Sequence, residues 1–302
     1  MPLLVTGTIG IDTIETPHAK AEGVSGGSCA YFAAAASLHH RPIRIVGAVG
    51  GDWPTEHAAL LASINGLCLE GLEHRKDSKT FAWGGKYFDN MNQRTTVFTE
   101  LGVLEEAPPT VPSTYRDSRI IFLANSHPRI QIDFLNRFPN RTLAVADTMD
   151  LWIDIARDEL NELFKHIDGL IINDSEATQL TDLENPIEAA KELITHGPNF
   201  VIVKKGEHGA VIVHPDGEFV LPAFELQPSE VIDPTGAGDS FAGGFLGYIA
   251  ACKTIDFEAM KQAMAWGTIT ASFTIQSFGL DGLVATTKQQ LQTRMDTFQS
   301  SN

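Results

Sequence analysis

Short apolar runs recur along this chain, and helix-prone stretches separate several of them. Continuous apolar strands that alternate with helices are typical of a parallel sheet covered on both faces. The pattern therefore predicts an α/β fold with a doubly wound, mainly parallel sheet flanked by helices. The strand-like runs lie at residues 3–7, 42–49, 120–124, 143–146, 170–172, 200–203 and 210–213. The helix-prone stretches lie at residues 28–40, 55–64, 151–166, 186–196 and 239–251.

Residues 79–100 break this rhythm. The segment KTFAWGGKYFDNMNQRTTVFTE alternates aromatic and polar residues around Gly84-Gly85 and Asp89-Asn90, which predicts a β-hairpin. Such an insertion between α/β units either covers a ligand or contacts another subunit. Because the chain shows no internal repeat and no clear linker, we expect one domain over residues 1–302. Its small β lid would be formed mainly by about 79–100, with a contribution from about 12–25.

Composition excludes several classes of function. The 302 residues carry a formal net charge of −16, which would repel a phosphate backbone, so we expect no nucleic-acid partner. The three cysteines are far apart and show no C-x-x-C spacing, which fits a reducing compartment better than a disulfide framework. No stretch approaches the roughly 20 apolar residues of a membrane span. We therefore expect a cytoplasmic protein without a membrane partner.

The segment VIDPTGAGDSFAGGF, residues 231–245, carries the strongest chemical signal. Small residues at Gly236, Ala237 and Gly238 allow successive backbone N–H groups to converge at the start of a helix. That end of a helix carries partial positive charge, so the turn is a candidate anion site. Asp239 would lie beside a bound phosphate and could accept a proton from an attacking hydroxyl as the O–P bond forms. A G-x-G turn at a helix start is common, however, and Asp is an ordinary residue there.

The full string D-P-T-G-A-G-D-S-F-x-G-G is more specific, and it closely resembles the signature of the pfkB/ribokinase family of carbohydrate and nucleoside kinases. Further segments extend the resemblance over nearly the whole chain. They are Asp12 after the first strand, Gly26-Gly27 before an alanine-rich helix, VGAVGGD at residues 46–52, NDSE at residues 173–176 and KGEHG at residues 205–209. The family fold, a doubly wound α/β core with a small β lid, agrees with the pattern of strands and helices.

The resemblance implies an ATP-dependent kinase that uses Mg²⁺ and for which K⁺ is a candidate activator. Asp239 would be the base, assisted by the N–H groups of residues 236–238. The residues implied at the acceptor are Asp12, Gly26 and Gly27. Those implied at the nucleotide are Asn173, Glu176, Lys205, Gly206 and Gly209. Glu176 would also hold Mg²⁺ through water, and a monovalent cation would be held by Asp233, Thr235, Ser272 and Gly279.

Structural alternatives exist for most of these positions. Asp12 could be a turn residue, and Gly26-Gly27 only a tight turn. Asn173 followed by Glu176 is close to a capping box, although a cap and a metal-water site are compatible. Lys204 and Lys205 could be a solvated pair at a strand end, or one of them could lie near phosphate. Asp233 could merely cap the turn before Pro234.

The acceptor is left open by two departures. Tyr31 stands where sugar-specific members often carry an Asn, so the contacts of that amide are lost. Lid aromatics could stack on a sugar or on a nucleobase; they are Phe81, Trp83, Tyr87 and Phe88. Polar lid residues could add contacts to the substrate or phosphate; they are Asn90, Asn92, Gln93 and Arg94. We expect a small-molecule acceptor, a sugar first and a nucleoside (adenosine-type) as the alternative, with a catalytically idle binding protein as a further alternative. Related lids often pair between subunits, which favours a homodimer.

Overall fold

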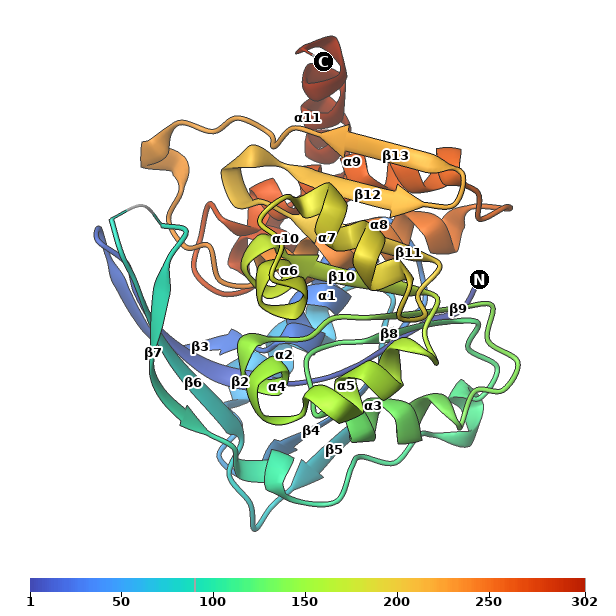
Figure 1. The fold of residues 1–302 in the computed structure, drawn as a ribbon. Helices are drawn as coiled ribbons and strands as arrows, with labels where there is room; N and C mark the ends of the chain where they lie inside the picture. Colours follow the sequence, from blue (N-terminus) through green and yellow to red (C-terminus); the bar gives the residue numbers. More distant parts are fainter. Residues whose placement is uncertain (90, 302) are drawn as a thin grey trace.

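The computed structural model describes residues 1–89 and 91–301, so Asn90 of the lid lies outside the described residues. Its two sheets are drawn in Figure 1. The larger has nine strands in the order β13-β12-β11-β10-β9-β8-β1-β4-β5, and the smaller has four in the order β3-β2-β6-β7. In the larger sheet every neighbouring pair from β11 to β5 is parallel, while β12 and β13 form an antiparallel edge. The expected doubly wound, mainly parallel sheet is thus confirmed.

Strands and helices alternate over much of the chain, whereas its first three elements are strands and its last four are helices. The strands are β1 Leu3–Thr6, β2 Gly10–Glu15, β3 Lys20–Gly26, β4 Ile43–Gly50, β5 Leu67–Arg75, β6 Phe81–Tyr87, β7 Arg94–Glu100, β8 Ile120–Leu123, β9 Leu143–Ala146, β10 Gly169–Asn173, β11 Phe200–Lys204, β12 Ala210–His214 and β13 Gly217–Leu221. The helices are α1 Ser28–Ser37, α2 Thr55–Ser63, α3 Pro128–Leu135, α4 Asp150–Ile155, α5 Arg157–Phe164, α6 Asp174–Thr181, α7 Pro186–Ile194, α8 Ala237–Ala251, α9 Phe257–Thr274, α10 Asp281–Ala285 and α11 Lys288–Ser301.

The parallel strands are buried on both faces. Successive side chains of a strand point to opposite faces, and the two cores divide them accordingly: Leu3 and Val5 belong to one core, whereas Leu4 belongs to the other. The first core packs against α1, α8, α9 and α11, with the Phe32 and Phe122 rings stacked at 4.3 Å. The second packs against α3, α5, α6 and α7. Double coverage explains why these strands are apolar without alternation.

The structure contains two helices, α4 and α5, where the sequence predicts one. The expected helix over residues 151–166 is interrupted at Ala156, whose φ of −136° and ψ of 37° lie outside the helical region. Because of the interruption, the two helices contact different parts of the protein. The Trp152 indole N–H of α4 donates to Asn125 Oδ1 at 2.8 Å, while α5 buries Leu160 and Phe164 in the core. Because each piece taken alone has an ordinary helical pattern, the sequence did not reveal the break.

The hairpin predicted within residues 79–100 is present as β6 and β7, which pair antiparallel. The pattern did not predict the other two strands of that sheet, β2 and β3, as strands. They pair antiparallel with each other, and β2 also pairs in parallel with β6. Figure 1 shows this four-stranded sheet standing to one side of the larger sheet, close to the loops that follow several of its strands.

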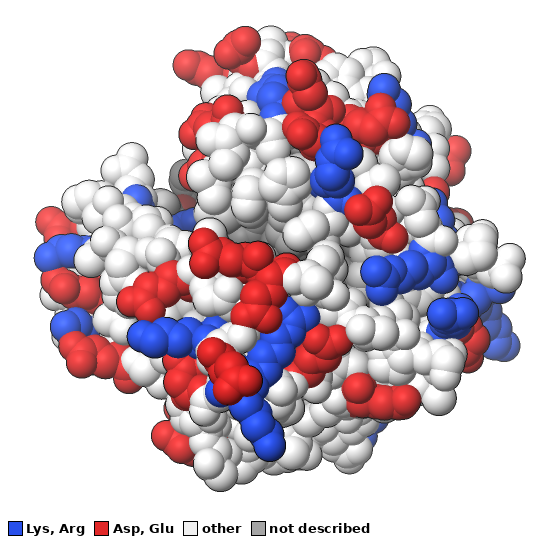
Figure 2. Space-filling view, turned by 90° about the horizontal axis from the view of Figure 1, so that it is seen from below, with Lys and Arg blue, Asp and Glu red and all other residues white. Residues whose placement is uncertain are grey.

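Acidic and basic side chains are interspersed over the face drawn in Figure 2. Within the described residues, no helix combines the length and the apolar character that crossing a membrane requires.

Candidate active site

The carboxyl edge of the parallel sheet gathers the polar residues. Asp147 follows β9, Asn173 ends β10 and Lys204 ends β11. Asn173 and Lys204 are direct register partners in neighbouring strands. In open α/β sheets, ligands bind in the crevice outside the carboxyl ends of the strands. Motifs that are far apart in the sequence therefore meet at one place.

The turn that leads into α8 has the geometry expected for an anion site. The Thr235 N–H donates to Asp233 Oδ1 at 2.8 Å, and Gly236, with a φ of 75°, is the residue before the helix. Asp239 lies in the first turn of α8. The Ala237 N–H donates to the Pro234 carbonyl at 3.1 Å. The amides of Gly236 and Gly238 are therefore better placed than that of Ala237 to bind an anion.

Lys204 lies against this turn. A side chain at Gly238 would place its Cβ 2.6 Å from Lys204 Nζ, so the absence of one there lets the ammonium group approach the backbone. Burial raises the pKa of Asp239 to about 6, and Lys204 and then Arg94 act in the opposite direction. The pKa of Asp147 is raised well above its usual range by burial and by Asp239. The candidate base thus lies in a desolvated cluster of mixed charge.

The predicted acceptor residues come together beside the same turn. The Gly27 N–H donates to the Asp12 carboxylate, and a Cβ at Gly26 would overlap that carboxylate. Burial, followed by the charge of Asp233, raises the pKa of Asp12 to about 7. Asp239 contributes in the same direction, so the two carboxylates face a common space. The lack of a side chain at Gly26 thus leaves room for the Asp12 carboxylate.

Tyr31 and the lid border the turn on two sides. Tyr31 is 1% exposed, its ring lies where a side chain at Gly236 would be, and its buried hydroxyl has no hydrogen-bond partner within the described part of the chain. From the lid, Tyr87 Oη lies 3.0 Å from Thr235 Oγ1. The lid therefore contacts the residues that form the anion turn.

Asn173 and Glu176 form a complete capping box at the start of α6. Glu176 Oε2 accepts from the Asn173 N–H at 2.8 Å, and Asn173 Oδ1 accepts from the Glu176 N–H at 2.8 Å. Burial raises the pKa of Glu176 to about 7, against the effect of Lys204. The free Glu176 oxygen is still available for water, so the cap and the expected metal role remain compatible.

The KGEHG segment forms a short turn after β11. The Lys205 N–H donates to the Gly209 carbonyl at 2.7 Å, and Gly206 and Gly209 have φ angles of 54° and 84°, which favour glycine. The Asn92 amide of the lid donates to Glu207 Oε1 at 3.1 Å. The lid therefore bridges from the anion turn to this loop.

The residues expected at a monovalent cation are only partly brought together. The segment after α9 contacts Asp233, because the Ile275 carbonyl accepts from the Asp233 N–H at 3.2 Å and Gly279 hydrogen-bonds the Asp233 carboxylate. Ser272, in contrast, donates to the Ile269 carbonyl at 2.6 Å and accepts from Arg294 at 2.9 Å. Ser277 lies between Ile275 and Gly279. Its hydroxyl and Asp233 Oδ2 are buried without a partner among the described residues.

Comparison with known proteins identifies the fold and the family. A family model described as pfkB family carbohydrate kinase matches residues 141–287. A cytidine kinase of Thermococcus kodakarensis is 30% identical over 280 residues, which is 88% of this chain and 98% of that protein. The chain belongs to the pfkB family. It is therefore a phosphotransferase that acts on an alcohol group.

Solved structures of this family share the fold. A ribokinase from Cryptococcus neoformans, solved in complex with ADP, has a TM-score of 0.80 and 21% identity over 97% of this chain and 99% of that one. A nucleoside kinase from Burkholderia thailandensis, solved in complex with inosine, has a TM-score of 0.78 and 20% identity over 98% of each chain. The ribokinase-like architecture expected from the motifs is confirmed.

Sequence reasoning missed Asp147 of this pfkB kinase, which follows strand β9. It named Lys204 and Lys205 without deciding which of them lies near phosphate, and in the structure Lys204 lies against the anion turn. A polar residue directly after a buried strand was the signal that could have found Asp147. Arg94 could not be placed from the sequence, because its role depends on where the lid lies.

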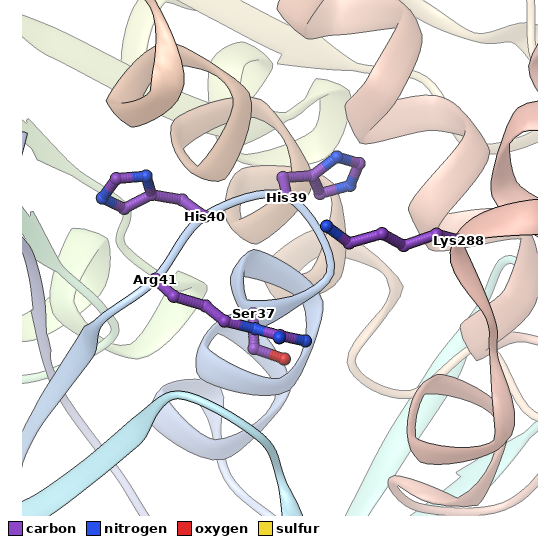
Figure 3. A pocket seen from close by; sticks show the side chains of 5 residues that line it. All are labelled: Ser37, His39, His40, Arg41 and Lys288. Carbon is purple, nitrogen blue, oxygen red and sulfur yellow. The ribbon is translucent and has the colours of Figure 1, made fainter.

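A hollow of about 160 Å³ elsewhere in this kinase is lined by residues outside these motifs. Figure 3 shows Arg41 and Lys288 extending toward it from the end of α1 and the start of α11. His39 lies beside them, with Nε2 at 2.8 Å from Thr270 Oγ1 of α9. The Arg41 stem packs against Gly66. These contacts join the ends of neighbouring helices.

Proposed function

We propose that this kinase transfers the γ-phosphoryl group of ATP to a hydroxyl of a nucleoside. The observation that carries the proposal is the position of Asp239, which lies at the start of α8 between the anion turn and the acceptor residues around Asp12. The choice of a nucleoside rests on the cytidine kinase, because the similarity to it extends over 88% of this chain. Partly exposed aromatics on the lid, Phe81 and Trp83, can stack on a base.

The chemistry asked of the chain is positioning and proton transfer. Asp12, Gly26 and Gly27 hold the acceptor so that its hydroxyl faces Asp239. The acceptor oxygen forms a bond to the γ-phosphorus while the bond from that phosphorus to the β,γ-bridging oxygen breaks and ADP leaves. Asp239 accepts the hydroxyl proton late in this step, as its acidity requires. The amides of Gly236 and Gly238 donate to the oxygens of the transferring group.

The nucleotide would lie along the loop of Lys205, Gly206 and Gly209, beyond Asn173. Mg²⁺ commonly uses one or two carboxylates, several waters and the substrate phosphates. Glu176 and Asp147 fit that description as two buried carboxylates that interact electrostatically and lie near Lys204. Bound Mg²⁺ would neutralise phosphate charge.

The unpartnered oxygens of Asp233 and Ser277 fit a monovalent cation such as K⁺ held with Thr235 and Gly279. The hydroxyl of Ser272, in contrast, is already engaged in hydrogen bonds.

The four-stranded sheet serves as the lid, formed mainly by residues 79–100 with the contribution of residues 12–25. Tyr87 and Asn92 reach across to the anion turn and to the Glu207 loop, so the lid spans the space where substrates would bind. Its closure would exclude water, which would otherwise receive the phosphoryl group. Residues 1–302 would then form a single domain with a lid that opens and closes.

The decisive experiment measures ADP release from ATP and Mg²⁺ across a panel of nucleosides, sugars and cyclitols, with and without K⁺. Turnover on nucleosides is expected. Asp239→Asn should lower kcat by at least about 10²-fold with little change in ATP affinity, because only proton transfer is lost. Turnover on simple sugars alone would contradict the choice of acceptor. Near-normal kcat in Asp239→Asn would contradict the assigned base, and ligand binding without any ADP release would favour an idle binding protein.

A further inference from the structure

We infer that Lys204 and Arg94 form a two-cation clamp on the transferring phosphoryl group, and that the lid must close to bring Arg94 into it. The inference rests on the proposed function and adds two residues that touch the reacting group. One belongs to the rigid sheet and the other to the lid. The clamp would make phosphoryl transfer conditional on closure over an acceptor.

Lys204 is the fixed member. It ends β11, where it is paired in register with Asn173, and it is partly buried. Its Nζ lies beside the backbone of Gly238, whose free amide is one of the two donors of the anion turn. An anion held by that amide would therefore contact Lys204 as well. A Cβ at residue 238 would displace the ammonium group from this position.

Arg94 is the member that the lid contributes. It begins β7 and lies directly opposite Tyr87 in the antiparallel pair of β6 and β7. Residues directly opposite each other in such a pair project from the same face of the sheet. The Tyr87 hydroxyl lies 3.0 Å from Thr235 Oγ1, so this face of the lid is the one turned toward the anion turn. The Arg94 guanidinium is 5.6 Å from the centre of the Trp83 ring, which steadies it there.

The electrostatics agree with this placement. Burial raises the pKa of Asp239, while Lys204 and then Arg94 lower it, so both cations face the candidate base. Among the ion pairs found in residues 1–89 and 91–301, neither Lys204 nor Arg94 is a partner. Two cations that border buried carboxylates without pairing to them are free to receive a further anion.

Two cations at this position would stabilise the negative charge of the transferring phosphoryl group in the transition state. In phosphoryl transfer, charge is spread over the equatorial oxygens, and one well-placed arginine can be worth about 10³–10⁵ in kcat. Asn92 contacts the Glu207 loop and Tyr87 contacts Thr235. Arg94 follows Asn92 by two residues and lies opposite Tyr87 in the hairpin, so it is next to both closing contacts. Opening the lid would withdraw it, leaving Lys204 alone on the phosphate. ATP without an acceptor would then be hydrolysed slowly.

The test compares Arg94→Gln, Arg94→Lys and Lys204→Gln with the wild type on whichever acceptor the panel identifies. Arg94→Gln should lower kcat by about 10²-fold or more, with ADP affinity measured without acceptor unchanged. Arg94→Lys should recover part of the loss, because lysine restores the positive charge but not the planar guanidinium group. Lys204→Gln should lower kcat comparably and also weaken ADP binding. Lys86→Gln, which removes a lid cation that pairs with Glu15, is the matched control and should behave as wild type.

A second readout separates a direct role from a structural one. Removing either cation should raise the pKa of Asp239, so the acid limb of kcat/KM should move to higher pH in both variants and stay in place in Lys86→Gln. The other groups that act on or are acted on by Asp239 are present in all variants; they are Asp147, Asp12, Cys29 and Tyr31. A wild type without turnover would refute the proposed function itself. A working wild type whose Arg94→Gln and Lys204→Gln variants keep wild-type kcat and pH profile would refute the clamp alone.

Discussion

Gly236 shows how a single residue can join packing to chemistry. Its φ of 75° belongs to the left-handed region, and the ring of buried Tyr31 fills the space where a side chain would be. The amide of Gly236 is also one of the proposed phosphate donors. Tyr31, which stands where sugar-specific members often carry Asn, therefore packs against the anion turn at Gly236.

We expect Gly236→Ala to lower the free energy of unfolding by roughly 2–5 kcal/mol. About 1–2 kcal/mol comes from the left-handed backbone and about 1–3 kcal/mol from overpacking against Tyr31. The variant should also lower kcat, because the amide is displaced. Denaturant unfolding and steady-state kinetics measure the two effects. Gly23→Ala is the matched control, since Gly23 has a φ of 68° with open space around it, and it should show only the backbone cost. Equal losses in the two variants would contradict the role of Tyr31.

At the scale of elements, β7 is the least protected strand of the lid. It forms one edge of the four-stranded sheet and is exposed along its whole length, with Val97 65% and Phe98 37% exposed. Edge strands usually carry Lys, Pro or a bulge that prevents further pairing. The segment TTVFT at residues 95–99 has no Lys and no Pro, and its protection is limited to a register shift at Val97 in the pairing with β6. We therefore propose that β7 pairs with a second copy of the chain, forming a homodimer through the lid.

Val97→Lys should weaken this dimer by placing a charge at the centre of the paired edge. Light scattering behind size exclusion should show a dimer for the wild type and a concentration-dependent shift toward monomer for the variant. Val220→Lys, at an exposed position on the edge strand β13 of the larger sheet, is the control and should leave the mass unchanged. A wild type that is monomeric at all concentrations would contradict the proposal.

At the scale of the whole molecule, the site concentrates negative charge in a chain whose net charge is already −16. Burial is the first cause that raises the pKa values of Asp12 and Glu176 to about 7 and of Asp233 and Asp239 to about 6. A carboxyl with a raised pKa binds its proton more tightly in the folded state than in the unfolded chain. Folding stability is therefore lost as pH rises from about the unfolded pKa of 4 through these folded values.

The ligand-free protein should accordingly be more stable near pH 5.5 than at pH 8. Thermal unfolding across this range measures the effect, and the midpoint is expected to fall by several degrees as pH rises. Asp12→Asn removes one of the responsible carboxyls and should flatten the dependence. Asp77→Asn, which neutralises an exposed carboxyl in the turn after β5, should leave the slope unchanged. A midpoint that rises from pH 5.5 to pH 8 would contradict the conclusion that burial raises these pKa values more than nearby cations and hydrogen bonds lower them.

The sequence alone determined the class of fold. Continuous apolar strands such as residues 143–146 and 200–203 require burial on both faces, and local periodicity reports that requirement directly. The DPTGAGD string also predicted a glycine turn at a helix start with Asp239 in the first turn, because glycine positions and a helix start are local properties. These motifs were sufficient to indicate the family that the comparisons confirm.

What only the tertiary structure decided depends on contacts between distant segments. Strands β2 and β3 became visible only through their pairing with each other and with β6. The choice of Lys204 over Lys205 depends on which side chain of the strand end faces Gly238. The placement of Arg94 depends on where the lid lies across the carboxyl edge of the sheet. Local sequence patterns record burial and turn geometry, whereas the spatial neighbours of a charge are set by the fold as a whole.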